Sequence, residues 1–181
     1  MFIEKRKILI HRLFESTQKV YLKFKKKQPW NITNQQLLAM PTETFGYHLG
    51  SLLQDNGFQL IPKVERHDCY HLLTGFSINV ADEIALQYLC FGNGKRTPYL
   101  LGVLFLGTLL LPEYLGYYIK AHRFGKQANP FHHFDFKQVL SVNFQSFRES
   151  IFTDRLWHAM GVAQQKISEI NKHHSFNIKS S

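Results

Sequence analysis

Four side chains that could bind a metal ion or move protons lie close together in this sequence. Three stand in the stretch His67-Asp68-Cys69-Tyr70-His71, and Glu83 follows after eleven further residues. A helix turns by about 100° per residue, so His67, His71 and Asp68 would project at roughly 0°, 40° and 100°. Side chains on one such arc can converge on a single point. Cys69 would project at about 200°, away from the arc, and is not predicted to be a ligand.

Glu83 can join this arc only if the chain reverses its direction. The rise of a straight helix from His71 to Glu83 would be about 18 Å, whereas a metal–ligand bond is about 2 Å. Gly75 can end a helix in the left-handed conformation. Asn79 can cap the next helix, which would hold Asp82 and Glu83 in its first turn, where the helix dipole favours carboxylates. The spacing therefore predicts a helix–turn–helix hairpin with the site between its arms.

Two imidazoles with one or two carboxylates form a ligand set that suits Zn²⁺, Fe²⁺, Mn²⁺ or Co²⁺. The set lacks the thiolates of a structural zinc site and leaves a position for water or substrate, as in a catalytic centre. The spacing alone leaves a second interpretation open, in which His67 and His71 are ordinary surface or half-buried side chains. A second pair, His132 and His133, is interpreted as a structural or surface feature of an aromatic loop.

The length and the charge favour one domain with an anionic partner. The chain has 181 residues, a net charge of +9 and a pI near 9.6. Such a charge suits a phospholipid surface, nucleic acid or an acidic substrate. Because no recognisable nucleic-acid module accompanies the basic residues, we do not predict nucleic-acid binding. The two cysteines cannot form a disulfide framework and fit a reducing, intracellular setting.

The expected fold class is all-α, a single-domain helical bundle that carries the metal site in its hairpin. Residues 1–30 are predicted to form a basic amphipathic helix, which could either pack on the domain or attach to a membrane. Residues 31–172 would form the helical core and residues 173–181 a flexible tail. Helices are expected at about 3–25, 34–38, 41–54, 63–73, 79–91, 99–111 and 136–170, the last interrupted near residue 154, with a loop at 123–135.

One apolar stretch, Tyr99–Leu111, is bracketed by Pro98 and Pro112. Its thirteen uncharged residues fall short of the roughly 20 that a spanning helix needs. We interpret it as a buried core helix or as an apolar wall that touches lipid, and not as a transmembrane anchor.

The segment from Arg66 to Phe76, followed by Asn79 and Asp82-Glu83-Ile-Ala-Leu86, resembles the HDxxH-x11-E signature of the fourth coenzyme Q (ubiquinone) biosynthesis protein family. Upstream, Leu38–Gly46 is similar to that family's "LxxxPxGTxG" stretch, so the resemblance covers roughly residues 37–95. The sequence departs from it where Glu43 and Asp82 replace the family's glycines. It also departs at Tyr88-Leu89-Cys90, where the family has an aromatic-acidic ending, and in the shortened lead-in at residues 63–66.

The resemblance implies an all-helical, often homodimeric protein that lies at a membrane surface and takes part in ubiquinone biosynthesis with other proteins of that pathway. It implies that His67, Asp68, His71 and Glu83 bind a divalent metal, usually zinc, in the oxidative decarboxylation at ring carbon C1 of a polyprenylated hydroxybenzoate. The apolar segments would hold the prenyl tail or another long-chain lipid. The expected location is the cytoplasmic, inner face of a bacterial cell membrane, or the mitochondrial inner membrane in a eukaryote. The alternative is a non-catalytic, prenyl-lipid-binding scaffold that organises a quinone biosynthesis complex.

Overall fold

The structure, a computed structural model, describes residues 5–10, 12–13, 23 and 26–179, with side chains described as far as residue 171. Within these residues the regular secondary structure is helical, and the β-type pairing is limited to an isolated bridge between Thr44 and Asn143. The predicted all-α fold class is confirmed. Of the predicted first helix, residues 5–10, 12–13 and 23 are helical, and the rest of that prediction lies outside the described residues.

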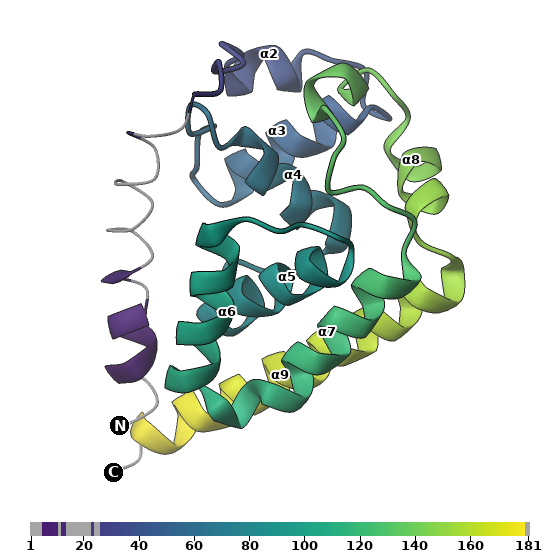
Figure 1. Cartoon of the computed structure of the whole chain (residues 1–181). Coiled ribbons are helices and arrows are strands. Elements are labelled where there is room, and N and C mark those ends of the chain that lie inside the picture. Colours follow the sequence, from purple (N-terminus) through teal and green to yellow (C-terminus); the bar gives the residue numbers. More distant parts are fainter. Residues whose placement is uncertain (1–4, 11, 14–22, 24–25, 180–181) are drawn as a thin grey trace.

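The helices follow one another with short connections (Figure 1). In chain order they are α2 (Asn34–Leu38), α3 (Phe45–Asp55), α4 (Glu65–Thr74), α5 (Val80–Gly92), α6 (Pro98–Leu110), the 3-10 turn η1 (Pro112–Tyr114), α7 (Leu115–Gln127), the 3-10 turn η2 (Phe136–Val139), α8 (Phe144–Ile151) and α9 (Asp154–Lys179). The backbone is helical as far as Lys179, so the flexibility of residues 173–181 stays a prediction.

Helix α3 begins four residues later than the start predicted at Pro41. Its first two backbone amides donate hydrogen bonds to another segment. Phe45 donates to the Val142 carbonyl, and Gly46 donates to the Leu140 carbonyl. The amide of Phe144 donates a hydrogen bond to the Glu43 carbonyl, and Thr44 pairs with Asn143 in an isolated bridge. Because this pairing competes with a helical turn, Thr44 becomes the residue that caps α3.

The loop predicted for residues 123–135 is wrong in its first part, because α7 continues to Gln127. This helix buries Tyr117, Tyr118, Ala121 and Gly125. Gly125 serves a close contact there: a Cβ at this position would lie 2.0 Å from the carbonyl oxygen of Leu89. A glycine that resembles a loop signal in the sequence is thus required by the packing of two helices.

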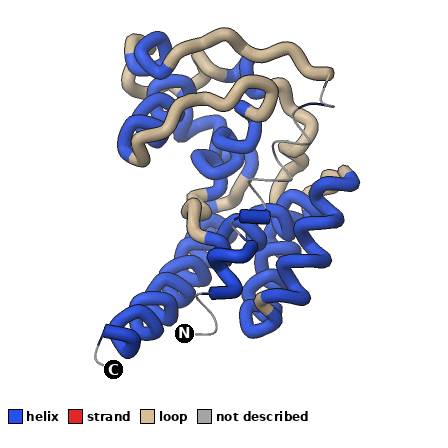
Figure 2. Tube along the Cα trace, turned by 90° about the vertical axis from the view of Figure 1, so that its left-hand side faces the viewer, coloured by secondary structure: helices blue, strands red, loops and turns tan. Residues whose placement is uncertain are grey.

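Helix α5 lies inside the molecule and packs closely on α7. Gly92 of α5 mirrors Gly125, since its Cβ would lie 2.1 Å from the His122 carbonyl oxygen. Three side chains of α5 are fully buried: Ile84, Leu86 and Leu89. Helix α7 in turn packs on α9, which runs alongside it (Figures 1 and 2). This enclosure fixes the axis of the helix that carries Glu83.

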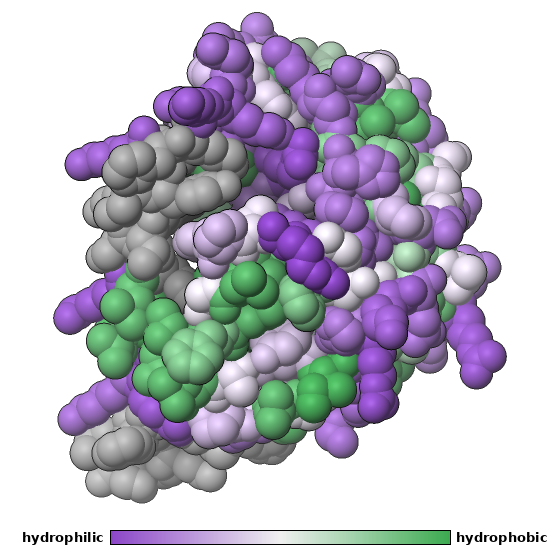
Figure 3. Space-filling model, in the orientation of Figure 1, coloured by the Kyte–Doolittle hydropathy of each residue, from purple (hydrophilic) through white to green (hydrophobic). Residues whose placement is uncertain are grey.

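The apolar helix α6 and the start of α7 leave large hydrophobic side chains exposed, which Figure 3 shows as a patch on one face. The exposed members are Leu101, Phe105, Leu106, Leu109, Leu115 and Ile119, and we call them the α6–α7 apolar surface. Among the described residues no single helix is long and apolar enough to cross a membrane. Residues Pro98–Leu110 and Pro112–Gln127 meet that test only as a pair bent by 104°.

Candidate metal centre

The predicted hairpin is present, and its two ends are formed by the expected residues. Helix α4 ends at Gly75, which adopts the left-handed conformation with φ of 71° and whose amide donates to the His71 carbonyl. Asn79 caps α5, because its side-chain oxygen accepts a hydrogen bond from the amide of Asp82 at 3.0 Å. The chain therefore reverses within the five residues 75–79 and brings Glu83 back to the histidines of α4.

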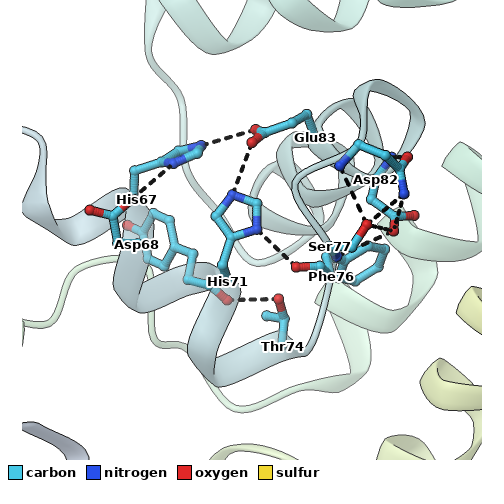
Figure 4. A network of polar contacts seen from close by, with 10 residues as sticks. His67, Asp68, His71, Thr74, Phe76, Ser77, Asp82 and Glu83 are labelled. Carbon is cyan, nitrogen blue, oxygen red and sulfur yellow. Dashed lines mark hydrogen bonds and ion pairs between the residues drawn. The ribbon is translucent and has the colours of Figure 1, made fainter. Parts of the chain in front are cut away.

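Three of the four predicted ligands gather at one point: His67, His71 and Glu83 each offer an atom within 4.8 Å of the other two (Figure 4). The Nε2 atom of His67 lies 3.3 Å from Oε2 of Glu83, and the Nε2 atom of His71 lies 3.1 Å from Oε1. Neighbouring ligands of a tetrahedral ion with bonds near 2.1 Å are about 3.4 Å apart. The nitrogen and oxygen atoms therefore already have nearly the separation that a bound divalent ion would impose.

The tautomer of His71 is fixed by its backbone partner. Its Nδ1 atom lies 2.9 Å from the carbonyl oxygen of Phe76, and because a carbonyl only accepts, Nδ1 must carry the proton. In the neutral ring Nε2 is then a lone pair that faces the carboxylate of Glu83. This atom is buried and has no hydrogen-bond partner by strict geometry, although Glu83 lies within ion-pair distance. In that form of the ring the lone pair of Nε2 faces an oxygen of Glu83, and a cation between the two atoms would bind both.

The charges of the centre favour an ionised pair at neutral pH. Burial alone would lower the pKa of His67, but the carboxylates of Glu83 and Asp68 outweigh it and raise that pKa to about 9. Burial alone would raise the pKa of Glu83, yet His67 and His71 hold it well below its usual range. The metal-free centre thus holds one proton on His67, which a metal ion would have to displace.

The fourth predicted ligand, Asp68, lies on the other side of His67. Its Oδ1 atom is 3.9 Å from Nδ1 of His67, whereas the gathered group uses Nε2 of that ring. A carboxylate behind a metal-binding imidazole holds the ring and makes it a stronger ligand. The structure thus brings together His67, His71 and Glu83 and places Asp68 where it can orient His67. The direct ligation predicted for Asp68 stays a prediction.

Comparison with known proteins identifies the family of this chain. A family model described as "Coenzyme Q (ubiquinone) biosynthesis protein Coq4" matches residues 62–155, just over half of the chain, and these residues include all four predicted site residues. The chain belongs to the Coq4 family. The upstream stretch Leu38–Gly46, on which part of the expected resemblance rested, lies outside the matched residues.

A solved structure has the same fold as this member of the Coq4 family. It is the crystal structure of a candidate ubiquinone biosynthesis protein from Nostoc punctiforme PCC 73102, with a TM-score of 0.57 and 19% sequence identity. The likeness covers 83% of this chain and 78% of the Nostoc chain. No curated protein matches this sequence. A role in ubiquinone biosynthesis follows from the family.

The donor set of this Coq4-family chain fits a divalent cation. Two imidazole nitrogens and a carboxylate suit zinc and the neighbouring transition metals, and the set leaves an open position for water or substrate. His71 is 5% exposed, whereas the side chains of His67 and Glu83 are 32% and 23% exposed. The centre is therefore anchored inside the domain at His71 and opens outward at His67.

The other histidine pair does not join this centre. The His132 ring packs on Gly94, and its backbone is held by the side chains of Asn93 and Tyr70. Among the described residues, His132 and His133 belong to no group of metal-binding side chains, so the structural interpretation of this pair agrees with its contacts.

Sequence reasoning missed the residues that hold the turn of the hairpin. The Phe76 carbonyl, the Ser77 hydroxyl and the Tyr117 hydroxyl each bind a residue of the centre or its neighbour Asp82. Ser77 and Asp82 stand close in sequence and could have been paired as a local side-chain contact. Tyr117 lies 35 residues beyond Asp82, and no local signal links the two.

Proposed function

We propose that this chain is a metal-dependent protein of ubiquinone biosynthesis that acts at a membrane surface on a polyprenylated hydroxybenzoate, at the C1 decarboxylation and hydroxylation. The observation that carries the proposal is the gathering of His67, His71 and Glu83 at one point, with Nε2 of His71 lying 3.1 Å from Oε1 of Glu83. Membership of the Coq4 family supplies the pathway, and the partial exposure of His67 and Glu83 leaves that side of the centre accessible to a substrate.

Each residue of the centre has a distinct role in this proposal. His67, His71 and Glu83 would hold the ion, and Asp68 would fix the ring of His67 from behind. A divalent cation bound there would supply Lewis-acid polarisation of a ring carboxylate or phenolate oxygen. Glu83 and His67 also hold a proton in the metal-free state, which would pass to solvent or substrate when the ion binds.

The α6–α7 apolar surface supports the proposed attachment to a membrane and the binding of a prenyl tail. Phe105 and Leu109 are 69% and 64% exposed, and each CH₂ buried in lipid or against a tail contributes about 0.8 kcal/mol. The basic side chains of Lys120 and Arg123 are exposed on α7 beside this surface, where they can meet anionic headgroups. The inner face of a bacterial cell membrane, or the mitochondrial inner membrane, is such a surface, and a homodimer with other quinone biosynthesis proteins around it is part of the proposal.

The exposed apolar surface also favours the second candidate function, a prenyl-lipid-binding scaffold that has no catalysis. Lipid binding by this surface requires neither His71 nor Glu83. The two functions therefore differ in what the removal of the candidate metal ligands should do.

The test is complementation of a strain that lacks its own protein of this family, with quinone content measured by mass spectrometry. His71→Ala and Glu83→Ala should abolish quinone production, whereas His158→Ala, at an exposed position outside the centre, should not. Elemental analysis of the purified full chain should find about one divalent ion in wild type and none in the two variants. If both variants complement fully, the catalytic proposal fails and the scaffold remains.

A further inference from the structure

Asp82, the residue before Glu83, is a buried carboxylate that accepts four hydrogen bonds. It is 5% exposed. Its Oδ2 atom accepts from the Ser77 amide at 3.2 Å, the Ser77 hydroxyl at 2.7 Å and the Asn79 side-chain amide at 2.9 Å. Its Oδ1 atom accepts from the Tyr117 hydroxyl at 2.6 Å. A carboxylate only accepts hydrogen bonds, so these donors come from the hairpin turn on one side and from α7 on the other.

The turn that Asp82 binds also determines the orientation of His71. The carbonyl of Phe76 accepts a hydrogen bond from Nδ1 of His71. The next residue, Ser77, donates two hydrogen bonds to Asp82, one from its amide and one from its hydroxyl. Asp82 in turn is covalently joined to Glu83, whose Oε1 atom lies 3.1 Å from Nε2 of His71. The contacts therefore close a ring from His71 through the turn to Glu83 and back, as Figure 4 shows.

Tyr117 connects this ring to a second element. Its ring is 5% exposed, and burial together with the nearby Asp82 raises the pKa of Tyr117, so its hydroxyl stays protonated and donates. Helix α7 packs closely on α5 through Gly92 and Gly125. The hydrogen bond from Tyr117 to Asp82 thus gives the first turn of α5 a fixed point outside the hairpin.

We propose that Asp82 is a positioning residue of the metal centre, which holds the turn at residues 76–79 against α5 and α7 so that His71 and Glu83 keep their separation. Without Asp82, the Phe76 carbonyl would be free to move with the turn, and the ring of His71 would lose its orientation. Groups that hold a ligand from behind typically change metal affinity by about 10- to 100-fold. This inference rests on the proposed metal binding.

Two neighbouring tyrosines on α7 provide a matched test. The Tyr117 hydroxyl binds Asp82, whereas the Tyr118 hydroxyl is buried and has no hydrogen-bond partner among the described residues. Each change to phenylalanine removes one buried oxygen from adjacent positions of one helix. Titration of the metal-stripped full chain with Zn²⁺ should show that Tyr117→Phe weakens affinity about tenfold, while Tyr118→Phe leaves it within about twofold.

Two substitutions of Asp82 separate the loss of hydrogen bonds from the loss of charge. Asp82→Ala removes all four hydrogen bonds and should weaken Zn²⁺ affinity by about 10- to 100-fold. Asp82→Asn can keep its oxygen toward Ser77 and turn its amide to the Tyr117 oxygen, so it should recover most of that loss. If Asp82 had only a structural role, the metal-free variants would melt at a lower temperature than wild type. Their Zn²⁺ affinity, measured well below that temperature, would then be unchanged.

A second readout needs no metal. The Nδ1 proton of His71, observed by NMR, should exchange with water faster in Tyr117→Phe than in Tyr118→Phe, and this comparison stands even if Asp82→Ala does not fold. The proposal is overturned if Tyr117→Phe and Tyr118→Phe agree in both the exchange of this proton and the Zn²⁺ affinity. If wild type binds no Zn²⁺ while the exchange rates differ as expected, the proposed metal binding fails and the positioning of His71 by Asp82 stands.

Discussion

Because a proton on His67 competes with a metal ion, the affinity of the centre for a divalent cation should rise with pH. The pKa of His67 is raised to about 9, with Glu83 as the largest favourable cause, whereas the ligand form of this ring is neutral. At pH 7, two units below that pKa, the neutral fraction is about 1%, so apparent affinity should be up to 100-fold below its plateau. The His67 side chain is 32% exposed, and solvent screening reduces this to between about 10- and 100-fold. Glu83 does not compete near pH 7, since its pKa is held well below the usual range.

The assay is titration with Co²⁺ at free concentrations set by a chelator, followed by the visible absorption of the bound ion, at several pH values from 6 to 9.5. The logarithm of the apparent affinity should rise by about one per pH unit and level off near pH 9. Glu83→Gln removes the main cause of the raised pKa, so its weaker binding should level off at a lower pH, toward the ordinary value near 6.5. An affinity that does not change between pH 6 and 8 in wild type would refute the role of a protonated His67.

Three further outcomes are expected. Gly125→Ala should lower the free energy of unfolding in urea by about 3 kcal/mol, because its Cβ would lie 2.0 Å from a backbone oxygen. Gly116→Ala, on the same helix with open space around it, should change that free energy by less than about 1 kcal/mol, toward greater stability. Phe105→Ser with Leu109→Ser should reduce co-sedimentation with anionic vesicles several-fold without lowering the melting temperature, since both side chains are exposed; unchanged sedimentation would contradict the membrane proposal. Zn²⁺ at 100 times its dissociation constant should stabilise the chain by about 2.7 kcal/mol in thermal unfolding, and no shift would argue against a site in the folded state.

The parts of the fold that the sequence predicted are those with local causes. Gly75 and Asn79 end and begin helices through bonds to residues a few positions away, and both were correctly placed. The start of α3 and the end of α7 were not correctly predicted, because each depends on a residue far away in the sequence. The amide of Phe45 donates a hydrogen bond to the Val142 carbonyl. Gly125 packs so closely on the carbonyl of Leu89 that a Cβ would collide with it. Neither partner can be recognised from the residues that surround Phe45 or Gly125 in sequence.

The candidate site shows the same division. The return of Glu83 to His71 was predicted from the spacing, which excludes a straight helix between ligands of one ion, together with the helix-ending and capping signals of Gly75 and Asn79. A helical projection gives the direction of a side chain but not the ring nitrogen that it faces. It therefore grouped Asp68 with the ligands without separating the two ring nitrogens of His67. Asp68 lies 3.9 Å from Nδ1 and Glu83 lies 3.3 Å from Nε2, so direct ligation by Asp68 stays a prediction. The hydrogen bond from Tyr117 to Asp82 depends on how α7 packs and could not be read from the sequence.

The hairpin is held together by bonds that do not depend on a metal. Gly75 and Asn79 close its two ends, Ser77 and Tyr117 bind Asp82, and the proton on His67 neutralises part of the charge of Glu83. A structural zinc site, in contrast, supplies much of the folding free energy of its domain. The metal-free chain should therefore keep its fold, and loss of function after metal removal would reflect the chemistry of the centre and not the collapse of the domain. This separation is what allows the metal-ligand variants to distinguish an enzyme from a scaffold.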